Sequence, residues 1–362
     1  MDVERLRANF PVCEELCYLN AGTDGPLPAQ AVSAAAAELE HAARRGRTAA
    51  HFERRGDLAE RLRAAYASAL ACEPAQLALT TCTTEGLAIV IDGLSLGAGD
   101  EILTSDEEHP GLLGALAVAR QLRGVSVRTV PFADVAAAAG PRTRLVACSH
   151  VSWKNGSLCP VDALAALPVP VLLDGAQGVG AIPVDVAALG CAAYSGAGQK
   201  WLCGPDGLGM LYVSPQLHER LAVRRRGYGN VVEPGAGLAA ELHEDARRFE
   251  TLCLSAETLA SGLAAWQVLD AAGWPQVHAR SRALAATLVA RLEDQGRTVL
   301  PRSPGTLVSF SCADPEGERL RLSEEGILLR TIPGEPLLRA SVGAWNDERD
   351  LDRLLSALDG RA

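Results

Sequence analysis

The sequence predicts an α/β protein whose central sheet is mostly parallel and is covered by helices on both faces. From about residue 77, short β-rich runs alternate with longer helical stretches. This alternation is typical of βαβ units, in which a helix joins two parallel strands. The expected strands of the sheet are 76–80, 101–105, 125–131, 144–148, 168–174, 192–195 and 209–213.

The composition is that of a globular protein with a sizeable core. The 362 residues are 48% hydrophobic and 22% charged, enough for two domains or one large domain with a smaller lobe. The net charge of −10 disfavours nucleic-acid binding. The charged N-terminus lacks the apolar core of a signal peptide, and no apolar run approaches the roughly 18 residues of a membrane span. We therefore expect a cytoplasmic protein that binds neither nucleic acid nor membrane.

Cysteine spacing excludes two common structural devices. The ten cysteines are scattered without C-x-x-C pairs, so the sequence predicts neither a zinc site nor a disulfide framework. We expect reduced, mostly buried thiols and no metal.

The chain before the first expected strand divides into three segments. A short helical arm leads to residues 18–28, which are dense in turn formers. This loop could line the approach to a substrate pocket or could be only a connection. Residues 29–71 have the composition of alanine-rich helices whose arginine-rich faces are expected to be solvated.

The chain after the expected sheet begins with an irregular segment and continues into a second lobe. Residues 214–250 read as a long functional loop, and 257–295 as a helical stretch interrupted near Gly273. The final helix has Asn346 as its expected N-cap. The second lobe has expected strands at 306–312, 327–331 and 337–342, and its last helix carries an apolar stripe of Leu351, Leu354, Leu355 and Leu358. We expect a large domain over 20–250 and a smaller α+β domain formed by 1–19 and 251–362.

Lysine usage points to the chemistry. The chain has only two lysines, Lys154 and Lys200, among its 34 basic residues. Arginine cannot replace a lysine that must form an imine. Lys200 lies in a turn of small residues between two apolar runs, and Asp174 ends a strand-like run upstream. A lysine for an aldehyde and an acid for a pyridinium nitrogen are the two groups that pyridoxal phosphate requires.

Two further stretches follow expected strands, where ligands gather in open parallel sheets. Thr83 and Thr84 begin an apolar helical run, and backbone N–H groups at a helix start suit a phosphate. A threonine-rich helix start alone is usually only a cap. His109 could cover a cofactor ring, and Gln177 could donate to its phenolate oxygen, although each could equally be an ordinary loop residue.

Arginines of the second lobe are candidates for substrate recognition. Arg330 and Arg339 flank residues 331–336. A guanidinium binds a carboxylate with two parallel hydrogen bonds, as recognition of an amino acid requires. Because arginine is abundant in this chain, position alone does not single out either residue.

Taken together, these stretches resemble fold-type I pyridoxal-phosphate enzymes of the class V aminotransferase and cysteine desulfurase group. The resemblance covers nearly the whole chain, and its most specific parts are residues 174–177, 199–201 and 338–341. Within the group, the chain is most similar to L-cysteine/cystine C–S lyases, on the basis of residues 106–113, 149–156, 200–205 and 329–332.

The resemblance implies a role for each matching residue of the cofactor site. Lys200 would attach the cofactor, and Asp174 would pair with its pyridinium nitrogen. His109 would stack on the ring, and Gln177 would contact the phenolate oxygen. The cofactor-binding set implied in this way is Thr83, Thr84, His109, Asp174, Gln177, Gln199 and Lys200, with Lys200, His109 and Asp174 as its catalytic members.

The resemblance also implies a substrate and a partner. Arg339 would bind the carboxylate of an amino-acid substrate, with Arg330 nearby and with Asn20 and Trp153 in the substrate-binding set. Members of the group are typically homodimers with active sites at the subunit interface, so a homodimer is expected.

Several positions depart from the pattern of the group. Ala197 occupies the position of a phosphate-binding Ser or Thr, and Gln199 replaces a histidine. Cys253 stands where the neighbouring subunit would lend a threonine. The desulfurase loop that carries a persulfide cysteine would lie between Arg330 and Arg339, but those positions contain no cysteine. A desulfurase mechanism is therefore disfavoured.

The leading expectation is β-elimination from cysteine, cystine or an S-conjugate, giving pyruvate and ammonia. Transamination and epimerisation begin with the same loss of the Cα proton, so motifs near Lys200 do not separate these reactions. A non-catalytic protein that retains the fold is the alternative from another class, motivated by the altered phosphate positions. Retention of both Lys200 and Asp174 makes it the weaker alternative.

Overall fold

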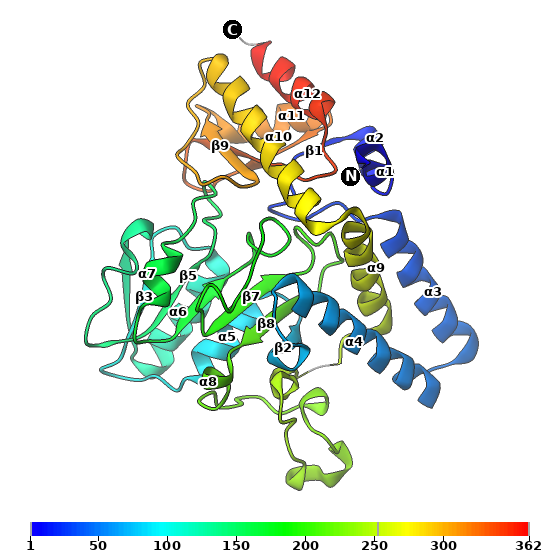
Figure 1. The fold of residues 1–362 in the computed structure, drawn as a ribbon, viewed down its shortest axis with the longest axis vertical. Coiled ribbons are helices and arrows are strands. Elements are labelled where there is room, and N and C mark those ends of the chain that lie inside the picture. The colour runs from blue at the N-terminus through cyan, green and yellow to red at the C-terminus, as the bar shows by residue number, and fades with distance from the viewer. Residues whose placement is uncertain (1, 252, 361–362) are drawn as a thin grey trace.

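The computed structural model describes residues 2–251 and 253–360 and contains a seven-stranded central sheet (Figure 1). The strand order is β2-β8-β7-β6-β5-β3-β4, and β8 alone runs antiparallel to both of its neighbours. The strands are β2 Leu77–Thr80, β3 Glu101–Ser105, β4 Ser126–Val130, β5 Thr143–Ser149, β6 Val171–Asp174, β7 Ala193–Ala197 and β8 Gly209–Val213. The expected strands and the mostly parallel arrangement are confirmed.

Both faces of the sheet are buried except at the edge strand β4, which explains why the other strands are mostly apolar rather than alternating. Leu77 and Leu79 of β2 face one core cluster, which includes side chains of α4 (Ala49–Ala69) and α9 (Ala256–Ala272). Ala78, between them, faces a second cluster with α5 (Thr83–Gly93) and α6 (Pro110–Arg123). Since neighbouring residues of a strand point to opposite faces, a strand covered on both sides must be apolar throughout.

A second, smaller sheet lies beside the first (Figure 1, top). Its order is β11-β12-β9, with every neighbouring pair antiparallel. These strands are β9 Leu307–Ser311, β11 Arg330–Thr331 and β12 Leu337–Ser341. They share a core with α10 Trp274–Asp294, α11 Pro315–Glu324 and α12 Glu348–Asp359, which includes the expected stripe Leu351, Leu354, Leu355 and Leu358.

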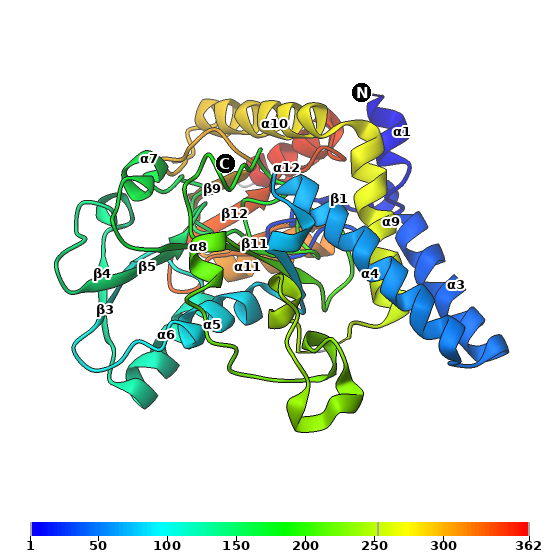
Figure 2. The ribbon, with the colours of Figure 1, turned by 60° about the horizontal axis from the view of Figure 1, so that its bottom comes forward.

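The N-terminal segment joins the smaller sheet region to the larger one. Helices α1 (Val3–Arg7) and α2 (Val12–Glu15) precede β1 (Cys17–Tyr18), which pairs in parallel with β10 (Ile327–Leu328). Helix α3 (Ala29–Arg45) then packs along α9, and an ion pair between Glu38 and Arg54 links it to α4 (Figure 2). The division of the chain into 20–250 and the two flanking segments stays a prediction.

The remaining connections contain short helical pieces. Helix α7 (Val161–Ala165) precedes β6, and α8 (Pro215–His218) follows β8. The expected irregular loop contains α8 and the 3-10 turns η3 Tyr228–Asn230, η4 Pro234–Ala239 and η5 Ala246–Phe249, and part of it projects away from the sheet (Figure 1, bottom). Two other 3-10 turns are η1 Pro74–Gln76 and η2 Phe132–Asp134. In the described part of the chain, no helix has the length and apolar character needed to cross a membrane.

Two local expectations are corrected. Asn346 is not the N-cap of α12: the cap is Asp347, whose carboxylate accepts from the backbone N–H of Asp350 at 3.2 Å. Asn346 is fully buried and bonds to Gly343 and Asp350 instead. Arg63 of α4 is not solvated but buried, because it pairs with Glu250 and donates to the carbonyl of Leu77.

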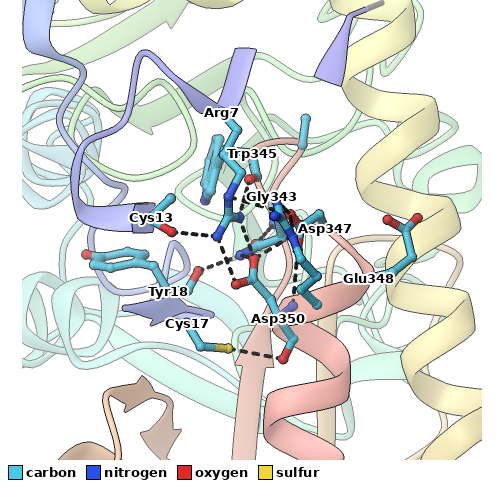
Figure 3. A network of polar contacts seen from close by, with 12 residues as sticks. Arg7, Cys13, Cys17, Tyr18, Gly343, Trp345, Asp347, Glu348 and Asp350 are labelled. Atoms are coloured by element: carbon cyan, nitrogen blue, oxygen red, sulfur yellow. Dashed lines mark hydrogen bonds and ion pairs between the residues drawn. The ribbon is translucent and has the colours of Figure 1, made fainter. Parts of the chain in front are cut away.

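A buried polar network ties the N-terminal arm to the C-terminal helix (Figure 3). Arg7 donates to both carboxylate oxygens of Asp350, at 2.7 and 3.1 Å, and to the carbonyl oxygens of Trp345 and Cys13. Asn346 donates to the carbonyl of Tyr18 and to Asp350. The network thereby fixes the chain where it leaves α2 and approaches residues 20–25.

Replacement of Asp350 by Ala should destabilise the protein by about 3 kcal/mol, because the partly buried guanidinium of Arg7 loses its nearest counter-charge and the buried amide of Asn346 loses an acceptor, while only Asp347 at 3.6 Å remains near Arg7. Denaturant unfolding would measure the loss. The matched control on the same helix is Asp352→Ala, whose carboxylate pairs with Arg291 at the surface and should leave the unfolding midpoint nearly unchanged. Equal effects of the two substitutions would contradict a structural role for the network.

Candidate active site

One cavity of ≈ 210 Å³ brings together residues from both sheets. It lies at the carboxyl ends of parallel strands of the central sheet, where ligands of such folds bind. Asp174 ends β6, His109 follows β3, and Lys200 follows β7. The expected residues that line it are Thr83, Thr84, His109, Trp153, Asp174, Gln177, Gln199, Lys200, Arg330 and Arg339. Of the expected site residues, Asn20 alone does not line it.

Lys200 is an amine whose charge is disfavoured by its surroundings. Burial lowers its pKa to about 8, and the guanidinium groups of Arg339 and Arg330 act in the same direction. The carboxylates of Asp174 and Asp24 act against this shift. More of the amine is therefore unprotonated near neutral pH than in an ordinary lysine, and the unprotonated form is the one that attacks an aldehyde.

Asp174 is a buried acid that faces the same cavity. The backbone N–H of Ala176 donates to its Oδ1 at 3.0 Å. Burial raises the pKa of Asp174, whereas this hydrogen bond and the charge of Lys200 oppose the rise. A cation placed beside the carboxylate would remove most of the cost of burying it. A protonated pyridine nitrogen is such a cation.

His109 is held as a neutral ring. It caps α6, and its Nδ1 accepts from the backbone N–H of Gly111 at 3.1 Å, so a neutral ring carries its proton on Nε2. Burial lowers its pKa to about 4, with Lys200 and the two arginines contributing. The indole of Trp153 meets the imidazole edge-on at 5.3 Å between ring centres. A neutral, fixed imidazole suits stacking over a flat aromatic ligand.

The start of α5 leaves polar groups free to bind an anion. Its N-cap is Cys82, which makes no side-chain capping bond, so the alternative of a simple threonine cap is not realised. The Oγ1 of Thr83 is buried without a hydrogen-bond partner in the described chain. Because α5 is an 11-residue helix, its N-terminus also offers backbone N–H groups and a favourable dipole. A phosphate group would satisfy all of these donors.

The two arginines lie at the other side of the site, on the smaller sheet. Arg339 is 1% exposed and donates from Nη1 to the carbonyl of Trp153 at 2.6 Å. Its Nε and Nη2 are buried and have no partner in the described chain. Burial, followed by the charge of Arg330, lowers the pKa of Arg339 to about 9. An unpaired buried guanidinium is costly, so the site is built to receive an anion such as a carboxylate.

The cavity wall between these ends is fixed by amide contacts. Gln177 donates from Nε2 to the carbonyl of Gly22 at 2.7 Å and accepts from the indole N–H of Trp201 at 2.9 Å. The Oε1 of Gln199 is buried and unpaired among the described residues. Asn20 lies beside the cavity, where its Oδ1 accepts from the hydroxyl of Thr23 at 2.8 Å. Asn20 therefore contacts a residue that lines the cavity, Thr23, and does not line the cavity itself.

The positions that depart from the group offer few polar contacts. Ala197 is buried in β7 and brings no hydrogen-bonding side chain to the phosphate end. Cys253 is exposed, and its relation to a partner subunit stays a prediction. Among residues 2–251 and 253–360, there is no group of three or more His, Cys, Asp or Glu side chains that could hold a metal ion.

Several residues of the site were not singled out from the sequence. Gly22 and Thr23 line the cavity and belong to residues 18–28, for which the sequence allows either a pocket approach or a simple connection. Gly22 is required there because a Cβ would lie 2.9 Å from Nη2 of Arg339. Cys82 and Ala176 complete the lining. No pattern in a single sequence distinguishes these small residues from ordinary loop residues.

Two consecutive carboxylates, Glu107 and Glu108, hydrogen-bond to the loop that carries Trp153. Glu108 is buried and accepts from the backbone N–H and the hydroxyl of Ser149 at 2.8 and 2.6 Å. Glu107 accepts from the hydroxyl of Ser152. Burial raises the pKa of Glu108 to about 7. The pair fixes the loop of His109 against the loop that carries Trp153.

The fold and this arrangement define a pyridoxal-phosphate-dependent enzyme of fold type I. The sequence profile of the Aminotransferase class-V family matches residues 17–354, and the chain belongs to that family. The expected enzyme class, a pyridoxal-phosphate-dependent lyase or aminotransferase, is confirmed.

Relatives of the chain catalyse different reactions. It is 30% identical to the isopenicillin N epimerase of Streptomyces clavuligerus, with 99% of this chain and 98% of the relative covered. It is 33% identical to a probable cysteine desulfurase of Pseudomonas aeruginosa, with coverage of 98% and 96%. Family membership therefore does not select one reaction.

A solved structure matches closely in shape. The cystine C–S lyase C-DES, in complex with its reaction product cysteine persulfide, superposes with a TM-score of 0.91 at 29% identity, covering 96% of this chain and 98% of the other. A C-DES mutant whose structure carries glycine covalently linked to the PLP cofactor gives a TM-score of 0.92 at 28% identity, covering 97% and 98%. The expected resemblance to this group is confirmed.

Pyridoxal phosphate followed by borohydride should label Lys200 and leave Lys154 unmodified, since Lys154 pairs with Glu335 outside the cavity. The yield after brief exposure should rise with a midpoint near pH 8, because deprotonation of Lys200 supplies the attacking amine. Peptide mass spectrometry over a pH series would measure both. Equal labelling of the two lysines would contradict the assignment.

Replacement of Thr83 by Val should weaken binding of pyridoxal phosphate about tenfold or more, because one charge-assisted hydrogen bond is lost while the shape is kept. Equilibrium dialysis with absorbance detection would give the dissociation constant. Thr81→Val is the matched control, since the hydroxyl of Thr81 bonds to Glu85 instead. A similar loss in both variants would mean that the helix start, rather than the hydroxyl, was disturbed.

Proposed function

We propose that the protein is a pyridoxal-phosphate-dependent C–S β-lyase that acts on cystine or a related cysteine derivative and releases pyruvate and ammonia. The observation that carries this proposal is a single cavity in which Lys200, Asp174 and the unpaired guanidinium of Arg339 meet. When bound, pyridoxal phosphate supplies an electron sink for the pair released at Cα. Thr83 and Thr84 at the start of α5 would hold its phosphate.

Each side chain of the site has a separate role in the proposed elimination. Arg339 binds the substrate carboxylate through Nε and Nη2, which orients the amino acid. Lys200, with its lowered pKa, accepts the Cα proton as general base. With the cofactor bound, Asp174 would hold a proton on its pyridine nitrogen and His109 would cover its ring. Departure of the sulfur group from Cβ leaves an enamine, which water hydrolyses to pyruvate and ammonia.

The positions of the thiols support a lyase over a desulfurase. A desulfurase must bring a nucleophilic cysteine to the substrate sulfur. No cysteine lies between Arg330 and Arg339. The cavity-lining thiol is Cys82, at the start of α5 beside Thr83. Its place at the phosphate end is unsuited to attack on a substrate that is held by the arginines.

Epimerisation is the second candidate, because the isopenicillin N epimerase matches almost the whole chain. It requires a second proton donor on the face of Cα opposite Lys200. His109 covers the ring, but its low pKa makes it a poor acid at neutral pH. This difference favours elimination. Transamination needs only Lys200 to move the proton, so product analysis has to separate it.

We also propose a cytoplasmic homodimer. All ten cysteines are free thiols, most of them buried, which is typical of a reducing compartment. The phosphate end has unsatisfied polar groups, including Thr83, and an alanine where the group has a hydroxyl. A second copy that covers this end would complete the contacts, as the resemblance to dimeric enzymes implies.

The purified, cofactor-loaded protein should convert cystine into pyruvate and ammonia in equal amounts, as measured with lactate dehydrogenase and glutamate dehydrogenase. Lys200→Ala should lower the rate by at least about a thousandfold, since the general base is removed. Lys154→Arg should retain activity. Deuterium incorporation at Cα without pyruvate would identify an epimerase, and accumulation of pyridoxamine phosphate would identify an aminotransferase.

A further inference from the structure

We infer that Glu108 is a positioning residue that releases a proton when a cationic ring nitrogen binds to Asp174. The carboxyl group of Glu108 is buried and does not line the cavity. It would therefore act through Asp174 and touch neither cofactor nor substrate. The inference concerns the cofactor site alone, so it applies equally to elimination, transamination and epimerisation.

Three hydrogen bonds hold the carboxyl group of Glu108 between the ends of two strands. The hydroxyl of Ser105, at the end of β3, donates to Oε1. The backbone N–H and the hydroxyl of Ser149, at the end of β5, donate to Oε2 at 2.8 and 2.6 Å. No Lys, Arg or His nitrogen lies within 4 Å of the two oxygens among residues 2–251 and 253–360. A buried carboxylate without a cation beside it is costly to ionise, even when several donors face it.

Asp174 lies on the next strand at the matching position. Ser149 of β5 and Asp174 of β6 are partners in the parallel register, and the backbone N–H of His150 donates to the carbonyl of Asp174 at 2.8 Å. Glu108 is therefore bonded to the residue directly beside Asp174. Since neighbouring strands lie about 4.8 Å apart, the charge of one of these buried acids favours a proton on the other.

The pKa of Glu108 agrees with this geometry. Burial raises it to about 7, and the negative charge of Asp174 adds to the rise. The hydrogen bonds from Ser105 and Ser149 oppose the rise without cancelling it. Glu108 can therefore gain or lose a proton near neutral pH, which an ordinary glutamate cannot do.

Other titratable groups around Glu108 are uncharged near pH 7. A hydrogen bond to a neighbouring thiol, followed by burial, raises the pKa of Cys148, so this residue of β5 stays protonated. Burial lowers the pKa of His109 and of His150 to about 4, so both rings are neutral. None of these three groups supplies a charge that could replace that of Asp174.

The nearby charged side chains have partners of their own. The carboxylate of Glu107 accepts from the hydroxyl of Ser152, and Arg128 of β4 pairs with an acid at the start of β3. Asp174 is therefore the charged group to which Glu108 responds.

A cation bound to Asp174 offsets the negative charge that acts on Glu108. The pKa of Glu108 then falls, and at a pH between the two values the carboxyl group releases a proton. A fall of about one pH unit corresponds to a tenfold change in affinity. By reciprocity, a ligand with a protonated ring nitrogen binds more tightly as the pH rises through this range. The competing explanation is that Glu108 only supports the loop of His109, in which case its charge has no effect on binding.

The test counts the protons released when 4-deoxypyridoxine 5-phosphate binds to the full-length, cofactor-free protein. This probe keeps the ring nitrogen and the phosphate of the cofactor but lacks the aldehyde, so Lys200 cannot react with it. Calorimetric titration in buffers of different ionisation enthalpy gives the proton count at each pH. Midway between the two pKa values, the native protein should release about half a proton per site more than Glu108→Gln, which keeps an amide acceptor but cannot titrate. Protonation of the probe itself cancels in this difference.

The same titrations give affinities. Over the pH range that spans both values, the affinity of the native protein should rise about tenfold relative to that of Glu108→Gln. Two further variants test how the coupling arises. Ser149→Ala removes a donor from the ionised carboxyl group and should move the pH of greatest release upward. Glu107→Gln, the matched control, changes the adjacent acid and should leave the proton count unchanged.

Equal proton counts in the native protein and in Glu108→Gln would overturn the inference. If Glu108→Gln does not fold, a native proton release whose pH is not moved by Ser149→Ala would overturn it as well. A loss of affinity in Glu108→Gln that is the same at every pH would show that the carboxyl group only supports the fold. No turnover takes place in these titrations, so pyruvate formation from cystine remains a separate test of the proposed reaction.

Discussion

The site depends on burying an amine and a carboxylate in one cavity without pairing them directly. Burial lowers the pKa of Lys200 and raises that of Asp174, while their mutual attraction limits both shifts. Each group can therefore bind a group that the other does not supply. The amine can react with an aldehyde, and the acid can pair with a protonated ring nitrogen. Arg339 adds a third unsatisfied charge. Such a site is costly when empty of ligand, and the surrounding sheet must hold it in place.

The strands of this sheet could be predicted from the sequence. Two-sided burial gives continuous apolar runs, and the polar residues that interrupt them, such as Asp174 at the end of β6, mark the ligand edge. The scarcity of lysine made Lys200 conspicuous. Both signals are local, so the fold class and the central pair of the candidate site could be predicted without knowledge of tertiary contacts.

Other features depend on contacts between distant segments and left no local signal. Arg63 lies on a helix rich in exposed arginines, and only the approach of Glu250 makes it a buried residue. Asp347 rather than Asn346 caps α12, and the side chain of Asn346 instead donates to the carbonyl of Tyr18, far away in the sequence. Thr23 belongs to the site because Arg330 reaches it from a distant part of the chain.

The arm at the start of the chain has a consequence for biosynthesis. Arg7 is held by Asp350, and the N–H of Ser341 donates to the carbonyl of Leu19 at 2.7 Å. Residues 20–25, of which Gly22 and Thr23 line the cavity, are therefore anchored by partners that the ribosome makes much later than this segment. A nascent chain can assemble its central sheet early, but it acquires the complete wall of the candidate site only after α12 has been released.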